Sequence, residues 1–314
     1  MSHKSTNMFT EFQSLPALFD YFNTEDKCSE YLVKMRFPEG ISCPHCNHKK
    51  VYNTMRKKSD GTVVKSFKCA NPKCYKKFTV LAGTYMEGTK IELRLWIAAF
   101  YLIASHKKSI SSVQLAKFLN VSQKTGWFIL HRVRGVLTIE TPEKLTGIIE
   151  ADETYVGGKG GKQGRSTDTK TPVFGIVERG GRLRAAVVSD AKRKTIMPII
   201  EANVKHGSII VTDEWGAYNS ASNKFFHERV NHSQGQFVRE GLFHTNTIEG
   251  FWSQLKRQII GTHHWVSRKH LDRYVKECAY KWNSRLFSDP DRFSMVLTHT
   301  EGRLKYKDLT ANLS

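Results

Sequence analysis

Three acidic residues occupy positions that suit ligands of a divalent metal ion. Asp152 follows the largely apolar stretch 148–151, and Asp213 follows the largely apolar stretch 208–212. Both are therefore expected at the tips of buried strands. Glu249 lies in a segment whose apolar residues recur with helical spacing. Magnesium and manganese prefer carboxylate oxygens, and two such ions about 3.5–4 Å apart can hold the attacking and leaving oxygens of a phosphoryl transfer. We therefore predict a metal-dependent site formed by two strand ends and one helix.

The charge balance indicates a polyanionic partner. The 314 residues include 49 Lys and Arg against 29 Asp and Glu, a formal net charge of +20. This surplus is typical of a nucleic-acid binder, although a basic protein can also be merely solvated or bind anionic membranes. The first residues are polar, and no run of about 18 apolar residues occurs. We therefore expect a cytoplasmic protein with no membrane partner.

Two close pairs of cysteines predict a second, structural metal site. The pairs bracket a segment with the pattern of a short hairpin, and they are Cys43 with Cys46 and Cys69 with Cys74. Clustered cysteines in a reducing compartment indicate metal ligation rather than disulfides. Four thiolates form a closed tetrahedral Zn²⁺ site, whose binding energy also stabilises the fold of a small segment. The pattern predicts a zinc ribbon.

Residues 112–127 have the apolar and capping pattern of a helix-turn-helix, with Ser122 capping the second helix. A short helical hairpin without DNA contact has the same apolar positions. The DNA-contacting residues predicted from this motif are Lys124, Trp127, His131 and Arg132. Just upstream, residues 89–92 match a capping box, which predicts a helix that starts after Thr89.

The elements around the acidic residues have a recognisable order. Strands are expected at 173–178 and 183–188 after the one that ends in Asp152, and a helix at 194–204 precedes the strand that ends in Asp213. Three strands, a helix, a strand and a helix are the order of a ribonuclease-H-like fold. We expect an α/β protein with the following parts: an N-terminal helical segment at 1–40, a zinc ribbon at 41–84, a helix-turn-helix domain at 89–140, a ribonuclease-H-like catalytic domain at 145–290 and a C-terminal tail at 291–314.

Basic residues near the acidic ones are candidates for contact with the DNA backbone. The glycine-rich segment 157–165 lacks the spacing of a P-loop, so its Lys159 and Lys162 are expected either to contact phosphates or to lie in a solvated loop. Lys256 and Arg257 extend the helix of Glu249, with the same two possibilities.

Several motifs in order resemble one known family. They are Cys43–Cys46, Glu150–Lys159, Thr212–Tyr218 and His244–Trp252, followed by Arg257, Gly261 and a helix after Ser267. Over nearly its whole length the chain resembles the DDE transposases of bacterial insertion sequences that carry an N-terminal zinc ribbon, which are relatives of the eukaryotic Merlin elements. The resemblance implies a ribonuclease-H-like core that binds terminal inverted repeats and uses Mg²⁺ or Mn²⁺ for strand cleavage and strand transfer. It also implies that Asp152, Asp213 and Glu249 are the catalytic triad.

Several residues keep more than one interpretation. Residues 246–249 also fit a capping box, in which Glu249 would only accept a backbone hydrogen bond. Asn246 lies one turn before Glu249 and could complete the metal shell, orient DNA or cap the helix. Glu150, Glu153 and Glu214 are expected behind the ligands or in solvent. The aromatic residues at 263–265 could form a core turn or stack on a displaced base.

The predicted function is that of a transposase acting on double-stranded DNA, both the inverted repeats and the target. Synapsis of two transposon ends implies at least a homodimer, in a bacterial, nucleoid-associated protein. The alternatives are a DNA-binding regulator with an inactive core and a metal-dependent nuclease that never rejoins ends.

Overall fold

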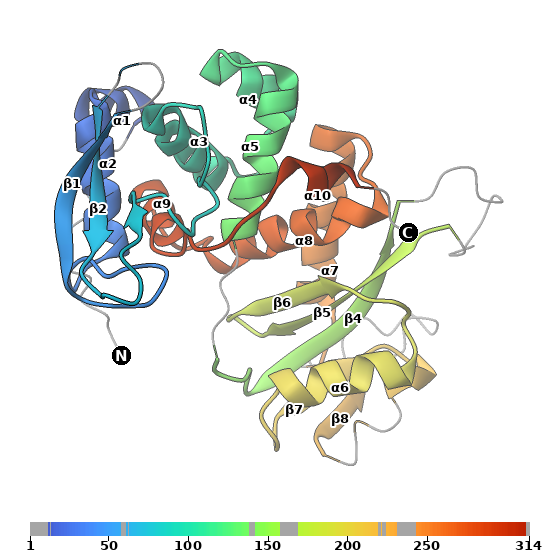
Figure 1. Cartoon of the computed structure of the whole chain (residues 1–314). Coiled ribbons are helices and arrows are strands. Elements are labelled where there is room, and N and C mark those ends of the chain that lie inside the picture. The colour runs from blue at the N-terminus through green and yellow to red at the C-terminus, as the bar shows by residue number, and fades with distance from the viewer. Residues whose placement is uncertain are drawn as a thin grey trace. The chain divides into compact units, whose positions relative to one another are not determined.

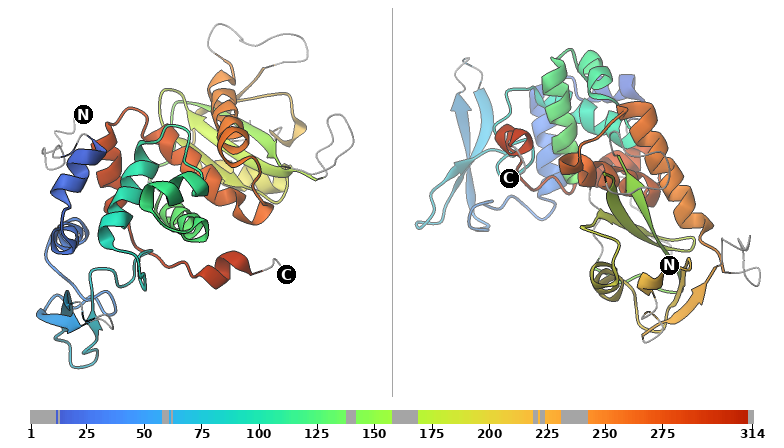
Figure 2. Two further views of the ribbon diagram at one scale, coloured as in Figure 1. Left: turned by 90° about the horizontal axis from the view of Figure 1, so that it is seen from above. Right: turned by 90° about the vertical axis from the view of Figure 1, so that its right-hand side faces the viewer.

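The computed structural model describes residues 12, 14–57, 61, 63–137, 142–157, 169–218, 221, 224–230 and 243–311. The chain forms two compact units (Figures 1 and 2), one made of Met1–Leu137 with Phe287–Ser314 and the other of Thr138–Leu286. Among the described residues, no helix has the length and apolar character needed to cross a membrane.

The first unit begins with two helices and a small antiparallel sheet. The helices are α1 (Leu15–Tyr21) and α2 (Glu25–Arg36), and the strands, in sheet order, are β1 (Val51–Lys57), β2 (Val63–Cys69) and β3 (Lys77–Phe78). The register pairs Val51 with Cys69. The start of β1 and the end of β2 therefore lie side by side, which brings the two cysteine-bearing turns together.

The rest of the first unit is helical. Its helices are α3 (Leu93–Ser105), α4 (Ser112–Leu119), α5 (Gln123–Val136), α9 (Asp289–Leu297) and α10 (Tyr306–Thr310). α4 ends at Asn120 in the left-handed conformation (φ 50°, ψ 49°). The Ser122 side chain accepts the Thr125 N–H, so the predicted cap of α5 is confirmed. A Cβ on Gly126 would lie 2.8 Å from the Ser112 carbonyl oxygen, so this glycine allows α4 and α5 to approach closely.

The predicted capping box at residues 89–92 is wrong. α3 starts at Leu93 after Glu92, whose side chain makes no capping hydrogen bond. The Thr89 hydroxyl oxygen instead accepts the Ile91 N–H at 3.0 Å and the Trp96 indole N–H at 2.9 Å. A local turn and a side-chain contact therefore compete successfully with the cap.

The second unit is built on a five-stranded mixed sheet. In chain order its elements are β4 (Ile148–Val156), β5 (Thr171–Glu178), β6 (Leu183–Val187), α6 (Arg193–Asn203), β7 (Ile209–Thr212), the 3₁₀ turn η1 (Gly216–Tyr218), β8 (Phe226–Arg229), α7 (Asn246–Gln258), the π-helical turn η4 (Ile259–His263) and α8 (Arg268–Asn283). The strand order is β6-β5-β4-β7-β8. β4, β5 and β6 pair antiparallel, whereas β7 runs parallel to both β4 and β8.

Helices pack on both faces of this sheet. Side chains alternate along β4 and β5, so Ile149 and Phe174 join the core on the face covered by α6, while Val173 and Val177 join the core on the face covered by α7 and α8. The expected strands at 173–178 and 183–188 and the expected helix at 194–204 are confirmed to within two residues.

Candidate active site and metal centre

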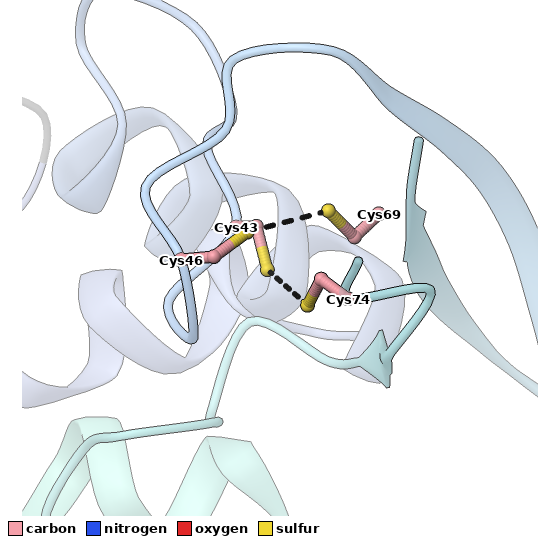
Figure 3. A group of neighbouring side chains, drawn as sticks. All are labelled: Cys43, Cys46, Cys69 and Cys74. Atoms are coloured by element: carbon pink, nitrogen blue, oxygen red, sulfur yellow. Dashed lines mark hydrogen bonds between the residues drawn. The ribbon is translucent and has the colours of Figure 1, made fainter. Parts of the chain in front are cut away.

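The four predicted zinc ligands lie together in the first unit (Figure 3). All their sulfur atoms are within 4.8 Å of one another, with Cys43 Sγ 3.9 Å from Cys74 Sγ and Cys46 Sγ 3.6 Å from Cys69 Sγ. Zn–S bonds of about 2.3 Å in a tetrahedron place two sulfurs ~3.8 Å apart. The spacing of the cysteine sulfurs therefore fits a structural Zn²⁺ ion.

Hydrogen-bond donors surround these sulfurs. The Asn71 N–H donates to Cys69 Sγ at 3.4 Å, and the Asn71 side-chain amide donates to Cys46 Sγ at 3.8 Å. The backbone N–H of His48 lowers the pKa of Cys46 to about 7. Such donors stabilise thiolates and orient them toward a metal.

Of the two aspartates of the predicted triad, one lies on β4 and the other directly follows β7, the parallel neighbour of β4. The pairing aligns Glu150 of β4 with Val211 of β7, and the same register carried two residues further aligns Asp152 with Asp213. Asp213 directly follows β7, as predicted, but Asp152 lies in the middle of β4 rather than at its tip. Burial, followed by the charges of Glu153 and Asp213, raises the pKa of Asp152 to about 7. The aspartates are therefore close enough for their charges to repel.

A fully buried carboxylate on β4 holds the start of α7. Oε2 of Glu150, which is 0% exposed, accepts the backbone N–H groups of Thr247 at 2.8 Å and Ile248 at 3.0 Å. Its Oε1 accepts the Thr247 hydroxyl at 2.7 Å and an Arg179 N–H at 3.0 Å, and it lies 3.3 Å from His244 Nδ1. A negative charge at a helix N-terminus satisfies donors that have no partner within the helix. Glu150 is thus an internal cap for α7, buried rather than solvent-facing.

A second contact runs from α7 back to β4. The Trp252 indole N–H donates to Asp152 Oδ2 at 2.8 Å. Its ring packs on Gly175 of β5, where a Cβ would lie 2.7 Å from the indole. Glu150 of β4 therefore holds the start of α7, and Trp252 of α7 contacts β4 one turn further along. The Trp252 contact orients Asp152.

Glu249 and Asn246 are exposed on the first turn of α7. The N-cap is Thr245 rather than Asn246, so the capping box proposed for 246–249 is wrong. Glu249 Oε1 instead accepts the Thr245 hydroxyl at 3.0 Å. In the described parts of the chain, groups of three or more closely spaced Cys, His, Asp or Glu ligand atoms are limited to the cysteine cluster. The structure therefore brings Asp152 and Asp213 together without bringing Glu249 into ligand distance of both.

Glu153, expected behind the ligands or in solvent, influences the two aspartates, and Asp152, Glu153 and Asp213 together form an acidic cluster. The hydroxyl of Tyr218, a fully buried residue, donates to Glu153 Oε2 at 2.6 Å. Burial raises the pKa of Glu153, and its charge contributes to the raised pKa of Asp152. Three acids occur within Glu150–Glu153, and this density is the signal in the sequence. Strand alternation puts Glu150 and Asp152 on one face of β4 and Glu153 on the other.

The predicted DNA-contacting residues differ in exposure. Lys124, Lys256 and Arg257 are exposed, and Trp127 is half-buried. Lys124 Nζ lies 4.8 Å from the centre of the Tyr306 ring. Lys159 and Lys162 lie outside the described residues.

His131 and Arg132 are interior residues, which corrects their assignment to DNA contact. His131 is 0% exposed and Arg132 is 9% exposed. The Arg132 guanidinium donates to the carbonyl oxygens of Leu304 at 3.3 Å and Glu87 at 3.4 Å, and it lies 4.3 Å from the centre of the Phe128 ring. These contacts turn the side chain into the first unit rather than toward a ligand.

Known relatives match both units. Residues 144–283 match a family model described as an ISXO2-like transposase domain, and residues 23–77 match a transposase zinc-ribbon domain. An uncharacterized protein in transposable element ISH50 of Halobacterium salinarum is 28% identical over 294 residues, which cover 86% of this chain and 94% of that protein. An uncharacterized transposase-like protein of Haemophilus influenzae is 31% identical over 104 residues, 33% of this chain and 82% of that protein.

The matched zinc-ribbon region contains Cys43, Cys46, Cys69 and Cys74, and the matched transposase region contains the acidic cluster and α7. Together with the tetrahedral spacing of the sulfurs, the ribbon match supports a structural Zn²⁺ ion. Transposases process DNA and therefore bind it. The chain belongs to the family of transposases that combine a zinc ribbon with an ISXO2-like transposase domain.

Proposed function

We propose that the protein is a DDE transposase that binds the terminal inverted repeats of an insertion sequence and catalyses metal-dependent strand cleavage and strand transfer. The observation that carries the proposal is the parallel pairing of β4 with β7, whose register, continued by two residues, aligns Asp152 of β4 with Asp213 just after β7. Glu150 and Asp152 of β4 also accept hydrogen bonds from Thr247 and Trp252 of α7, the helix of Glu249.

The order of the strands supports a ribonuclease-H-like core. Strands β6, β5 and β4 pair antiparallel, and β7 and β8 then continue the sheet parallel to β4. Helices lie on both faces of the sheet. In the first unit, the short turn between α4 and α5 and the Ser122 cap support a helix-turn-helix. We propose that the exposed Lys124 on α5 contacts the DNA.

The donor set fits Mg²⁺ or Mn²⁺. Asp152 and Asp213 offer hard carboxylate oxygens in neighbouring positions, and burial, followed by the charges of Glu153 and Asp213, raises the pKa of Asp152 to about 7. A divalent cation removes the repulsion between these charges. Asp152, Asp213 and Glu249 would hold the ions, with Asn246 one turn before Glu249. When bound, the ions supply charge stabilisation to the attacking and leaving oxygens of a phosphodiester.

The residues of the chain supply positioning. Water would attack the phosphodiester at the transposon end and release a 3′ hydroxyl, and that hydroxyl would then attack target DNA. Hydrolysis and transesterification would thus use one site without a covalent protein intermediate. Trp252 fixes the orientation of Asp152, Glu150 fixes α7, and the exposed Lys256 and Arg257 on α7 are suited to contact the DNA backbone.

Cleavage and joining of a labelled transposon end by the zinc-loaded protein test this proposal. The substrate carries the inverted repeat found beside the coding region, and Mg²⁺ or Mn²⁺ starts the reaction. We expect cleaved and joined products from the wild type. Asp152→Asn and Asp213→Asn should fold and bind DNA but remain inactive, because each loses a charge needed to hold a cation. Near-wild-type activity in either variant would remove that residue from the triad.

The same assay separates the alternatives. A nuclease would cleave the end but never join it to target DNA, and a regulator would bind the end without cleaving it. Sedimentation of the complex with end DNA tests the homo-oligomer, at least a dimer, that synapsis of two ends requires.

A further inference from the structure

The connection between α7 and α8, which we call the corner, has an unusual backbone. α7 passes into the π-helical turn η4, and His264 follows with φ 60° and ψ −45°. The Trp265 N–H donates to the His263 carbonyl oxygen at 2.6 Å, which closes a three-residue γ-turn centred on His264. Both a π-helical turn and a γ-turn with positive φ are rare, and a positive φ on a non-glycine residue is strained.

Residues on each side of Trp265 are anchored, while its own side chain faces solvent. The His263 ring stands edge-on to Tyr274 of α8, with centroids 4.8 Å apart, and Val266 belongs to the core between the sheet and the two helices. Between these anchors Trp265 is 52% exposed, and Ile260 on the preceding turn is 67% exposed. The core-turn interpretation therefore does not hold for Trp265, and the corner presents its indole from a fixed backbone.

The helix ends on each side of Trp265 carry exposed basic residues. Lys256 and Arg257 occupy the last turn of α7, Arg268 is the first residue of α8, and all three are exposed. Such a patch repels a second copy of itself but attracts phosphates. An aromatic ring beside cations suits a nucleic-acid strand whose bases are accessible, because a ring can stack only on a base whose face is not already covered.

We propose that this corner, formed by Ile260, Trp265, Lys256, Arg257 and Arg268, binds an unpaired segment of DNA, with Trp265 stacking on one base. The proposal extends the proposed transposase function by adding unpaired DNA to its ligands, and it rests on that function only for the source of the strand. The recognition is independent of base sequence, because every base has a flat face.

Binding of the full-length, zinc-loaded protein to a short single-stranded oligodeoxynucleotide containing 2-aminopurine tests the proposal. No Mg²⁺ or Mn²⁺ is added, so the result does not depend on cleavage. Stacking quenches 2-aminopurine fluorescence, so we expect quenching by the wild type. Trp265→Ala should abolish the quenching and weaken single-strand binding about tenfold, while duplex binding changes less than about twofold. Trp265→Phe should restore part of both signals.

Phe226→Ala is the matched control, because Phe226 is 68% exposed on β8 and lies in the same unit. It should leave the quenching and both affinities unchanged. Melting curves of all variants verify folding. Wild-type quenching retained in Trp265→Ala, or an equal loss of single-strand and duplex binding, would overturn the proposal. So would a change from dimer to monomer in Trp265→Ala with unaltered quenching, because the corner would then be a contact between copies. Failure of cleavage by the wild type would instead count against the proposed function and leave this result intact.

Discussion

The cysteine cluster and the acidic cluster are both candidate metal sites, but they are assembled differently. Cys43 and Cys74 are 31 residues apart, and one small sheet brings all four sulfurs together. Glu150 and Thr247, which join β4 to α7, are 97 residues apart. The four sulfurs already have the spacing of a Zn²⁺ site, whereas Glu249 is not within ligand distance of both aspartates. Perturbing the two sites should therefore have different consequences.

The largest effect is expected from loss of zinc. Structural zinc contributes roughly 10–16 kcal/mol of apparent binding energy in small domains. Cys69→Ser should therefore abolish stoichiometric zinc and increase hydrogen exchange in β1–β3, with exchange in β4–β7 unchanged. Metal analysis and hydrogen-exchange mass spectrometry measure both effects. Cys28→Ala is the control, since Cys28 is a buried cysteine outside the cluster and its replacement should keep one zinc per chain.

Glu150→Gln tests whether α7 depends on the buried carboxylate. Glutamine loses the ion pair with Arg179 and replaces one acceptor oxygen of the α7 cap by an NH2 group, so we expect a loss on the order of 3–5 kcal/mol in the stability of the second unit. Denaturant unfolding measures this. Glu178→Gln is the control because Glu178 also pairs with an arginine, Arg182, but its side chain is 20% exposed. Equal losses in the two variants would contradict a special role for Glu150.

Trp252→Phe separates packing from orientation of Asp152. Phenylalanine keeps a ring on Gly175 but lacks the N–H that donates to Asp152, so stability should fall by about 1–3 kcal/mol and Mn²⁺ binding should weaken. Calorimetric titration with Mn²⁺ measures the binding. Trp282→Phe is the control because the Trp282 indole N–H is buried without an acceptor among the described residues. Unchanged Mn²⁺ affinity in Trp252→Phe would show that the contact is structural only.

The smallest expected effect is a loss of stability at acidic pH that depends on His227. Burial, followed by the charge of Arg229, lowers the pKa of His227 from 6.5 to about 4, and His227 Nε2 lies 2.9 Å from the Thr212 hydroxyl at the end of β7. The unfolded chain takes up this proton near pH 6.5 and the folded chain only near pH 4. The contribution of neutral His227 is therefore complete above pH 6.5 and lost as the pH falls toward 4. Melting temperatures across this range should fall less steeply for His227→Gln than for the wild type.

Some local patterns could be predicted from the sequence, whereas the capping box at residues 89–92 and the long-range contacts could not. The cysteine spacing and the Ser122 cap depend on a few neighbouring residues, and both predictions hold. The zinc ribbon and the transposase family are also confirmed. The position of Asp152 within β4 was missed because the apolar run before it hides the continuation of the strand.

The errors on α5 and α7 have one cause. A helical pattern does not reveal which polar side chains other segments will cover, so the burial of Arg132 by the Leu304 and Glu87 carbonyls could not be foreseen. For the same reason Glu150 was not recognised as the cap of a helix far along the chain. The ribonuclease-H-like fold, the catalytic triad and its Mg²⁺ or Mn²⁺ ions remain predictions.

Gly175 restricts which side chains can pack beside Asp152, although it has no polar group itself. It pairs directly with Asp152 across the sheet, and the Trp252 ring fills the space where its side chain would stand. A single added methyl group would displace the indole and with it the hydrogen bond to Asp152. We expect Gly175→Ala to weaken Mn²⁺ binding in the calorimetric titration as Trp252→Phe does. The position of the Trp252 indole, and with it the orientation of Asp152, therefore depends on a residue that has no side chain.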